Sequence, residues 1–326
     1  MIISRTPFRI SFAGGGTDFA DFYRKDGGEV VSTAIDKYIY VTINKRFDDS
    51  IRLSYTKTEI VEHFEQLQHG LVREAMRLTG VTSGVEITTI ADIPAKGSGL
   101  GSSSSLTVGL LNAFYAYHGK TVPVKQLAQE ACRIEIDILG EPIGKQDQYI
   151  AAYGGLKHFY FKPNDDVLVE PLIVRQERIA RLQDNLMLFY TNITRDAGSI
   201  FRELKTRSQD NFSGLRDLKG LAGELKILLE DFGKDDDEFG RLLRRGWELK
   251  KRLAGGITNQ TIEDCYQAAL SAGALGGKIL GAGGGGFLLL YCKKEHQDKA
   301  AKALASLRLL PFAFEPEGSR IIYADY

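Results

Sequence analysis

The sequence predicts a mixed α/β protein of two domains. The chain has 326 residues, a length typical of two domains or of one large one, and its 43% of hydrophobic residues can fill a substantial core. Its first half mixes strand-like and helix-like segments, whereas residues 197–275 are mainly helical in pattern and highly charged. This change of pattern places a boundary within 170–195, and we divide the chain into domains 1–180 and 181–326.

The first domain is expected to begin with a strand that ends in a glycine turn. Residues 1–13 alternate apolar and polar side chains and then meet Gly14-Gly15-Gly16-Thr17-Asp18. Residues 29–47 are rich in Val, Ile and Tyr, which is typical of strands. The elements expected next are a helix over 59–79, a strand over 85–93, a helix to about residue 117, a helix over 124–139 and further strands within 156–190.

The second domain combines charged helices with a second glycine loop. Residues 281–286 hold five glycines and are expected between a helix and the strand Phe287–Cys292. A helix near 295–307 and a last strand near 320–325 follow. The acidic run 234–238 is interpreted as the solvated start of a helix rather than as a metal cluster.

Composition narrows the class of partner. Lys plus Arg equals Asp plus Glu, 42 each, so no basic surface for nucleic acid is indicated. No apolar run reaches the length of a membrane span, and the N-terminus lacks the apolar core of a signal peptide. Three widely spaced cysteines predict reduced, buried thiols. We therefore expect a soluble, cytoplasmic protein with no membrane or nucleic-acid partner; an oligomer is possible, but composition does not reveal it.

The segment 94–105, Pro-Ala-Lys-Gly-Ser-Gly-Leu-Gly-Ser-Ser-Ser-Ser, joins a predicted strand to a predicted helix. Glycines let a backbone wrap closely around a ligand, and a helix N-terminus presents free N–H groups to anions. The segment lacks the Gly-Lys-Ser/Thr of a Walker A loop, and its glycines alternate, unlike G-x-G-x-x-G. A flexible linker is the alternative, but linkers are seldom wedged between a strand and a helix. We predict a polyphosphate ligand, with a kinase as the first hypothesis.

Charged residues near the two turns are the candidates for chemistry. Arg9 could neutralise charge on a reacting phosphate, and Asp18 could accept hydrogen bonds from sugar hydroxyls. The alternatives are a surface ion pair for Arg9 and an Asx-turn or helix cap for Asp18. Glu135 alternates with isoleucines on a predicted helix, so it is expected to point inward and to need a cation or a hydrogen-bond partner. Asp147 could accept a hydroxyl proton or orient the hydroxyl, with ordinary turn chemistry as the alternative.

Three segments in this order resemble the GHMP kinases, the family of galactokinase, homoserine kinase and mevalonate kinase. Residues 94–105 resemble its P-x-x-x-G-L-G-S-S-A-A motif, with Ser104 and Ser105 in place of the small apolar pair. Pro7-Phe8-Arg9 with residues 14–18 resembles the N-terminal motif of its sugar kinases, and residues 278–287 resemble its G-x-G-x-G-G motif. The resemblance implies a ribosomal-S5-like N-terminal domain and a ferredoxin-like C-terminal domain.

The resemblance also implies ATP and Mg²⁺ and assigns roles by position. Asp147 would be the catalytic carboxylate, Arg9 would stabilise the transferring phosphoryl group or tune the nucleophile, and Ser103 and Glu135 would hold Mg²⁺. The residues expected to contact the nucleotide are Lys96, Gly97, Ser98, Gly99, Leu100, Gly101, Ser102, Ser103 and Ser104. Those expected to bind substrate are Gly15, Gly16, Thr17, Asp18, Lys145, Arg195, Gly283, Gly284 and Gly285.

Within the family, residues 5–18, 134–148 and 193–195 are most similar to bacterial kinases that act on D-glycero-D-manno-heptose 7-phosphate. That resemblance implies transfer of the ATP γ-phosphoryl group to the anomeric C1 hydroxyl. The phosphate already on such a sugar needs cations, for which Arg195, Lys145 and Lys278 are candidates. A fucokinase-like or galacturonokinase-like sugar 1-kinase and a non-catalytic sugar- or nucleotide-binding regulator remain as alternatives.

Overall fold

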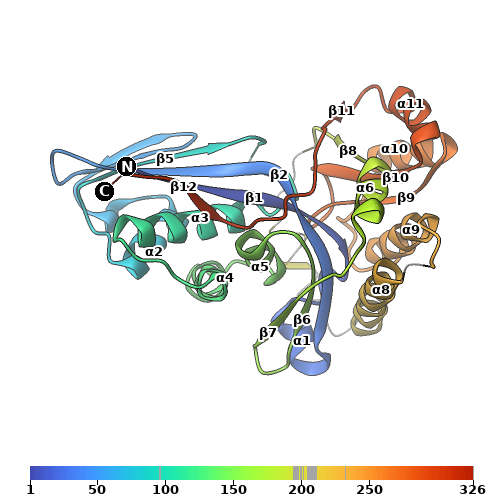
Figure 1. Ribbon diagram of the computed structural model, residues 1–326, viewed down its shortest axis with the longest axis horizontal. Coiled ribbons are helices and arrows are strands. Elements are labelled where there is room, and N and C mark those ends of the chain that lie inside the picture. The colour runs from blue at the N-terminus through green and yellow to red at the C-terminus, as the bar shows by residue number, and fades with distance from the viewer. Residues whose placement is uncertain are drawn as a thin grey trace.

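The computed structural model describes residues 1–94, 97–193, 198, 200, 202–203, 211–231 and 233–325. The described residues form an eight-stranded sheet and a four-stranded sheet, each packed with helices (Figure 1). The mixed α/β class predicted from the sequence is therefore confirmed.

Two long strands organise the first sheet. β1 (Ile2–Ala13) and β2 (Gly28–Lys45) pair antiparallel along almost their whole length. The C-terminal half of β2 pairs with β5 (Val85–Ala91), and its N-terminal half pairs with β6 (Leu156–Phe161). The remaining strands of this sheet are β3 (Ile51–Ser54), β4 (Thr58–Val61), β7 (Val167–Pro171) and β12 (Arg320–Ala324).

Helices cover one face of this sheet (Figure 1). They are α2 (Gly70–Thr79), α3 (Ser102–Tyr117), α4 (Val124–Cys132) and α5 (Gln146–Tyr153). Most of α3 is buried, and at Gly109 a Cβ would lie 2.8 Å from Thr6 Oγ1 on β1. This close approach places the N-terminus of α3 beside the middle of β1, where the Arg9 N–H donates to the Leu100 carbonyl over 3.1 Å.

The second sheet has the antiparallel order β11 (Arg308–Leu309), β8 (Leu186–Tyr190), β10 (Phe287–Cys292) and β9 (Ala274–Ile279). The helices on this side of the molecule are α6 (Gln176–Asp184), α9 (Asp237–Lys251), α10 (Gln260–Ser271) and α11 (Lys294–Ala303). A further helix, α8 (Phe212–Glu230), packs on α9 and also contacts β1 and β2 of the first sheet. The short α1 (Ala20–Asp26) follows β1 and lies near α8. In the part of the chain that the structure describes, no helix combines the length and apolarity that a membrane crossing requires.

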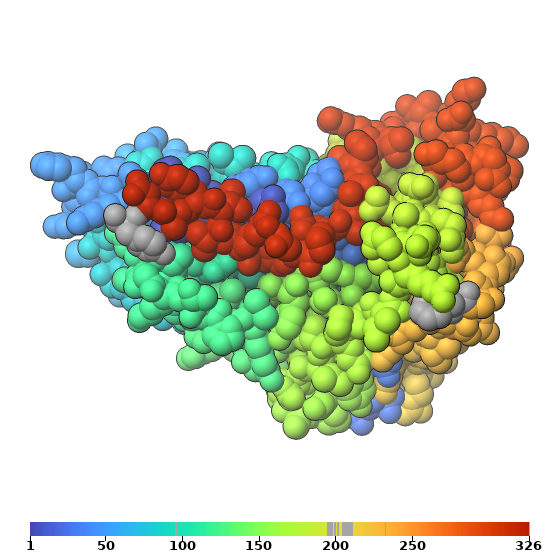
Figure 2. Space-filling model, in the orientation of Figure 1, coloured from blue at the N-terminus to red at the C-terminus, as the bar shows by residue number. Residues whose placement is uncertain are grey.

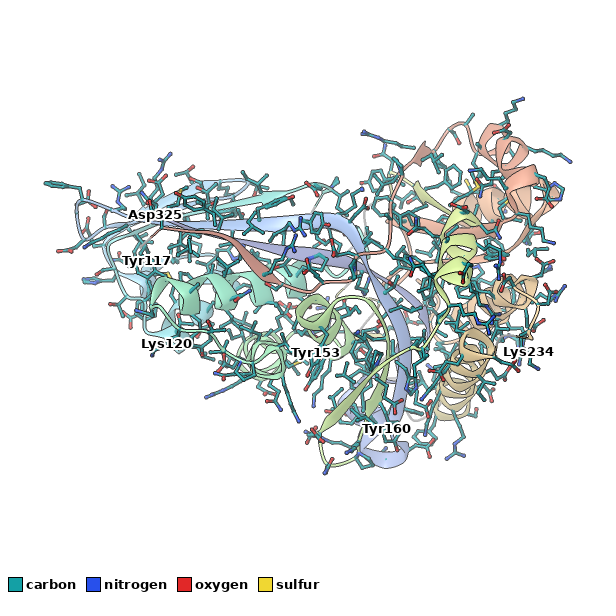
Figure 3. The ribbon with its side chains drawn as sticks, in the orientation of Figure 1. Tyr117, Lys120, Tyr153, Tyr160, Lys234 and Asp325 are labelled. Atoms are coloured by element: carbon teal, nitrogen blue, oxygen red, sulfur yellow. The ribbon has the colours of Figure 1, made fainter. Side chains whose placement is uncertain are left out.

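The end of the chain returns to the first sheet. β12 pairs antiparallel with β1, and the Met1 ammonium donates to the Asp325 carbonyl over 2.6 Å. Figure 2 shows this last segment as a band lying across the N-terminal half, and Figure 3 places Asp325 at the far end of the first sheet. The boundary near residue 180 stays a prediction.

Two expectations about local structure are wrong. Residues 59–79 are not one helix, because the β-branched residues of β4 pair with β3, a 3₁₀ turn follows at Phe64–Gln66, and α2 begins only at Gly70. The glycine loop 281–286 follows β9 rather than a helix. The sequence does not predict β9 because glycines interrupt its strand pattern. Glycine is required there because α9 packs closely on β9: a Cβ at Gly276 would lie 2.0 Å from the Gly240 carbonyl. The helix predicted over 124–139 forms, but its last part, Arg133–Ile138, is a π-helix.

Candidate active site

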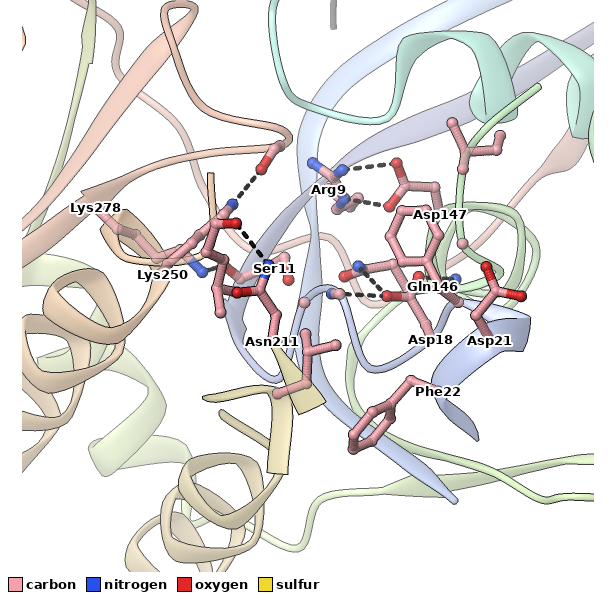
Figure 4. Close-up of a pocket in the computed structure, with 18 residues that line it drawn as sticks. Arg9, Ser11, Asp18, Asp21, Phe22, Gln146, Asp147, Asn211, Lys250 and Lys278 are labelled. Atoms are coloured by element: carbon pink, nitrogen blue, oxygen red, sulfur yellow. Dashed lines mark hydrogen bonds and ion pairs between the residues drawn. The ribbon is translucent and has the colours of Figure 1, made fainter. Parts of the chain in front are cut away.

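One cavity gathers the residues that the sequence singled out around Arg9 (Figure 4). Its wall comes from β1, from the glycine turn after β1, from the start of α5 and from α9, β9 and Gly281 of the second sheet. Segments more than a hundred residues apart therefore meet at one place. Among the candidates, Arg9, Gly15, Gly16, Asp18 and Asp147 line this cavity.

Arg9 and Asp147 form a two-bond ion pair inside the protein. Arg9 Nε donates to Asp147 Oδ1 over 2.7 Å, and Arg9 Nη2 donates to Oδ2 over 2.6 Å. The third nitrogen, Nη1, donates to the Gly99 carbonyl over 2.5 Å. Arg9 is only 4% exposed, so the alternative of a surface ion pair does not apply. This arrangement fixes a carboxylate beside the glycine-serine loop.

Asp18 is buried at the N-terminus of α5. Its carboxylate accepts hydrogen bonds from the Gly16 N–H over 3.0 Å, the Gln146 N–H over 3.1 Å and Gln146 Nε2 over 3.2 Å. Burial raises the pKa of Asp18, and these backbone bonds oppose the rise. A Cβ at Gly144 would lie 2.0 Å from Asp18 Oδ2, so glycine is required there. Asp18 thus caps α5, as one alternative held, and also lines the cavity.

The glycine-serine loop forms a cradle that the second glycine loop supports from behind. Gly97, Gly99 and Gly101 all have positive φ, at 74°, 74° and 78°. A Cβ at Gly99 would lie 2.5 Å from the Leu280 carbonyl, and one at Gly281 would lie 2.6 Å from Gly99 Cα. No side chain caps the start of α3, so its first N–H groups are available to an anion.

The cradle's serines lie next to a buried carboxyl. Glu135 is 0% exposed, and Gln148 Nε2 donates to its Oε2 over 2.6 Å. Within the described chain, Glu135 Oε1, Ser104 Oγ and Gln148 Oε1 are buried and make no hydrogen bond of good geometry. Burial raises the pKa of Glu135 to about 7, and the nearby hydroxyls of Ser104 and Ser103 and the amide of Gln148 oppose the rise. A buried carboxyl with a free oxygen beside serine hydroxyls fits a hard cation such as Mg²⁺, which also takes phosphate oxygens and water.

Among the described residues, no group of three or more His, Cys, Asp and Glu side chains is placed to hold a metal alone. A magnesium site here would therefore depend on few protein ligands and on the nucleotide itself. Ser103 is exposed in the first turn of α3, where its side chain can reach a ligand in the cradle.

Other expected substrate residues lie elsewhere. Thr17 is fully buried, and its hydroxyl donates to the Gly14 carbonyl over 2.8 Å, so it holds the turn. Lys145 lies 3.2 Å from Asp165 and over the Tyr23 ring, outside the wall of this cavity.

The three glycines of the second loop that were expected to bind substrate, Gly283, Gly284 and Gly285, are not in the cavity wall, although Gly281 of the same loop is. A Cβ at Gly283 would lie 2.6 Å from the Ile257 carbonyl, and one at Gly285 would lie 2.2 Å from the Ile193 carbonyl. The N–H of Gly284 donates to the same Ile257 carbonyl over 2.7 Å. Two further candidates, Lys96 and Arg195, are outside the described residues.

Several cavity residues had no role in the sequence-based site. Lys250, near the end of α9, donates to the Gly281 carbonyl, and burial lowers its pKa to about 8. Lys278 donates to the carbonyls of Ser11 and Phe12 over 3.0 and 3.1 Å. Lys278 was considered only as a phosphate cation. Lys250 lies seven residues after Leu243 and three after Trp247, on the apolar face of α9, and this spacing is the signal that could have found it. Gln146 and Ser11 also line the cavity. Gln146 precedes Asp147 and Ser11 lies two residues after Arg9, and this nearness to predicted site residues is the sequence feature that could have indicated them.

Known proteins resemble this chain along its whole length. The model described as GHMP kinases N terminal domain matches residues 60–155, and that described as GHMP kinases C terminal matches residues 225–308. The D-glycero-alpha-D-manno-heptose 7-phosphate kinase of Campylobacter jejuni is 32% identical, over 97% of each chain. The L-fucokinase/L-fucose-1-P guanylyltransferase of Bacteroides fragilis is 29% identical over 90% of this chain and 35% of the relative. The crystal structure of a D-glycero-D-manno-heptose 1-phosphate kinase from Bacteroides thetaiotaomicron superposes with a TM-score of 0.82, at 27% identity and full coverage of both chains.

Proposed function

Because the chain belongs to the GHMP kinase family and is a sugar kinase of that type, we propose that it transfers the ATP γ-phosphoryl group to the C1 hydroxyl of D-glycero-D-manno-heptose 7-phosphate. The product would be heptose 1,7-bisphosphate. The choice of a heptose as substrate is supported by the similar proteins of Campylobacter jejuni and Bacteroides thetaiotaomicron, both of which are named as D-glycero-D-manno-heptose phosphate kinases.

The observation that carries the kinase mechanism is the position of the Arg9–Asp147 pair. The pair stands between the cavity and the glycine-serine cradle: a Cβ at Gly101 would lie 3.3 Å from both Arg9 Cγ and Asp147 Oδ2. A hydroxyl in the cavity can therefore reach the carboxylate while a phosphoryl group lies at the cradle. Asp147 would accept or orient the hydroxyl proton, and Arg9 would hold that carboxylate and offset negative charge on the phosphoryl group.

ATP would lie with its phosphates on Gly97–Ser104, at the open N-terminus of α3. Ser103 and Glu135 would hold Mg²⁺, which supplies positive charge to the phosphate oxygens when it is bound. The unpaired Oε1 of Glu135 supports this assignment. The sugar would occupy the cavity, with Asp18, Gly15 and Gly16 around its hydroxyls.

A fucokinase-like sugar 1-kinase is the second candidate, and the likeness to the kinase and guanylyltransferase of Bacteroides fragilis favours it. Both candidates predict the same residues at the phosphoryl group and differ only in the sugar. A non-catalytic regulator is less well supported, because Arg9, Asp147 and Glu135 are assembled as a reaction would require.

ADP release separates these functions. Purified protein with ATP and Mg²⁺ is offered heptose 7-phosphate, the unphosphorylated heptose, fucose, galacturonate and mevalonate. We expect the highest kcat/KM with heptose 7-phosphate. Turnover of fucose without turnover of heptose 7-phosphate would favour the fucokinase-like function over the heptose phosphate kinase. No turnover of any sugar would contradict the proposed function.

A further inference from the structure

Two buried lysines face the cavity without a charged partner. Lys250 and Lys278 are 9% and 7% exposed, and neither forms an ion pair with a carboxylate that the structure describes. Lys250 donates to one backbone carbonyl and Lys278 to two. Figure 4 shows both lysines on one side of the cavity and Asp147 on the other. An ammonium group has three N–H donors, so both lysines keep donors for a ligand.

The other charges of the cavity form no ion pair with these lysines. Asp147 is already matched by Arg9, and Asp18 is shared among three N–H donors, although both carboxylates favour the ammonium form of Lys250 through their charges. The third carboxylate of the wall, Asp21, is exposed and lies on the side away from the lysines (Figure 4). Lys278 is instead close enough to two other cations, Lys250 and Arg9, for their charges to disfavour its ammonium form. Burying unpaired ammonium groups is costly, so the arrangement calls for an anion from outside the chain.

We propose that Lys250 and Lys278 bind the phosphate that the sugar carries before the reaction, and so select a phosphorylated sugar over a free one. This inference rests on the proposed function. Ser11 supports it, because its buried Oγ in the same wall has no hydrogen-bond partner among the described residues and can donate to the same anion. Of the three cations predicted for this phosphate, the inference keeps Lys278 and adds Lys250, whereas Lys145 is engaged by Asp165 and Arg195 is outside the described residues.

The position of Lys278 points to the phosphate of the sugar rather than that of the nucleotide. Lys278 is anchored on Ser11 and Phe12, whereas the nucleotide cradle meets β1 at Arg9. Two residues along a strand amount to about 7 Å. Lys250 lies nearer the cradle, because its partner Gly281 packs on Gly99, so it stands between the two phosphate sites. The cavity that both lysines line is walled by the turn at Gly15 and Gly16 and by no residue of the described cradle, 97–104.

Selectivity for the phosphorylated sugar tests the inference. We would measure kcat/KM for heptose 7-phosphate and for the unphosphorylated heptose with the wild type, Lys250→Met and Lys278→Met. Losing one charge-assisted bond to a phosphate should lower the ratio of the two constants about 10-fold to 100-fold. Lys251→Met is the matched control, because Lys251 is adjacent on α9 but pairs with Glu248 and Glu263. Its ratio should match the wild type.

An unchanged ratio in both lysine variants would overturn the inference. An equal loss with both sugars would also overturn it, because it would assign the lysines to the γ-phosphoryl group. Lys278→Arg guards against misfolding, since it keeps the charge and should keep more of the selectivity than Lys278→Met at a similar melting temperature.

A binding experiment keeps the inference separate from the proposed function. If the wild type phosphorylates no sugar, the proposed function fails, but inorganic phosphate can still be titrated calorimetrically into the protein. Weaker phosphate binding by Lys278→Met than by the wild type and Lys251→Met would support the anion site. Equal binding by all three would overturn it.

Discussion

The guanidinium of Arg9 faces the carboxylate of Asp147 edge to edge, with Nε–Oδ1 at 2.7 Å and Nη2–Oδ2 at 2.6 Å. The remaining nitrogen reaches the Gly99 carbonyl of the glycine-serine loop. One arginine therefore ties the carboxylate on α5 to the loop that we assign to the nucleotide.

Asp147→Asn should remove turnover and spare nucleotide binding. The amide keeps the size of the side chain but cannot hold a hydroxyl proton, so we expect kcat to fall about 10²-fold to 10⁴-fold. The affinity for ADP, measured by calorimetry, should stay close to that of the wild type. Near wild-type kcat would assign the carboxylate role to another residue.

Glu135→Gln should separate metal binding from folding. Burial raises the pKa of Glu135 from an ordinary 4.5 to about 7. The unfolded chain therefore loses this proton at lower pH than the folded protein does, and the free energy of unfolding falls as pH rises from about 4.5 to about 7. The neutral amide removes that cost, so the metal-free variant should melt at the same or a higher temperature than the wild type at pH 8. It should lose the extra stabilisation that Mg²⁺ adds to the ADP complex.

The control for Glu135 is Asp137→Asn, which changes an exposed carboxylate on the same π-helix. Its response to Mg²⁺ in the melting experiment should equal that of the wild type. A full Mg²⁺ response in Glu135→Gln would remove Glu135 from the metal site.

Gly144→Ala should weaken sugar binding through Asp18. The new methyl group would lie 2.0 Å from Asp18 Oδ2, so the carboxylate must move out of its hydrogen bonds. We expect KM for the sugar to rise about 10-fold, with ADP affinity unchanged. Gly220→Ala on α8 is the control, because its methyl would meet nothing within 4 Å, and it should leave KM unchanged. A wild-type KM in Gly144→Ala would show that Asp18 does not position the sugar.

Selectivity for the phosphorylated heptose should fall above about pH 8. Burial lowers the pKa of Lys250 to about 8; the charge of Arg9 adds to this effect, and Asp18 and Asp147 oppose it. Burial and the charges of Lys250 and Arg9 also lower the pKa of Lys278. An amine loses its charge as pH rises through its pKa, so phosphate binding weakens there. A ratio of kcat/KM for the two heptoses that is constant from pH 7 to 9.5 would contradict this.

The strands and helices could be predicted where one local period dominates. β1, β2 and β10 carry continuous strand patterns, and each lies within about two residues of its predicted range. β9 was not predicted because it contains glycines, which are rare in strands. These glycines make room for the helix α9 that packs on β9, and this packing cannot be read from the local sequence. The prediction of one helix over 59–79 failed because pairing with β3 overrides helical propensity at β4.

The residues of the candidate site also fall into two groups: those that a local motif could predict and those that only the fold brings to the site. Arg9, Asp18 and Asp147 stand in short motifs, so sequence alone could nominate them, although 138 residues separate Arg9 from Asp147. The helical spacing of α9 puts Lys250 on the apolar face with Leu243 and Trp247, but only the fold shows that this face reaches the cavity, while the adjacent Lys251 faces glutamates. Conversely, Thr17 and Gly283 belong to motifs, but their contacts show that they support loops.

The most direct test of the central claim is to identify the product formed from ATP, Mg²⁺ and D-glycero-D-manno-heptose 7-phosphate. Phosphorus and proton NMR of the purified product would show where the new phosphate is attached. We predict one new phosphate ester on the anomeric carbon, coupled to the C1 proton, with one ADP formed for each. A phosphate on any other carbon, or ADP formed without a sugar bisphosphate, would contradict the account.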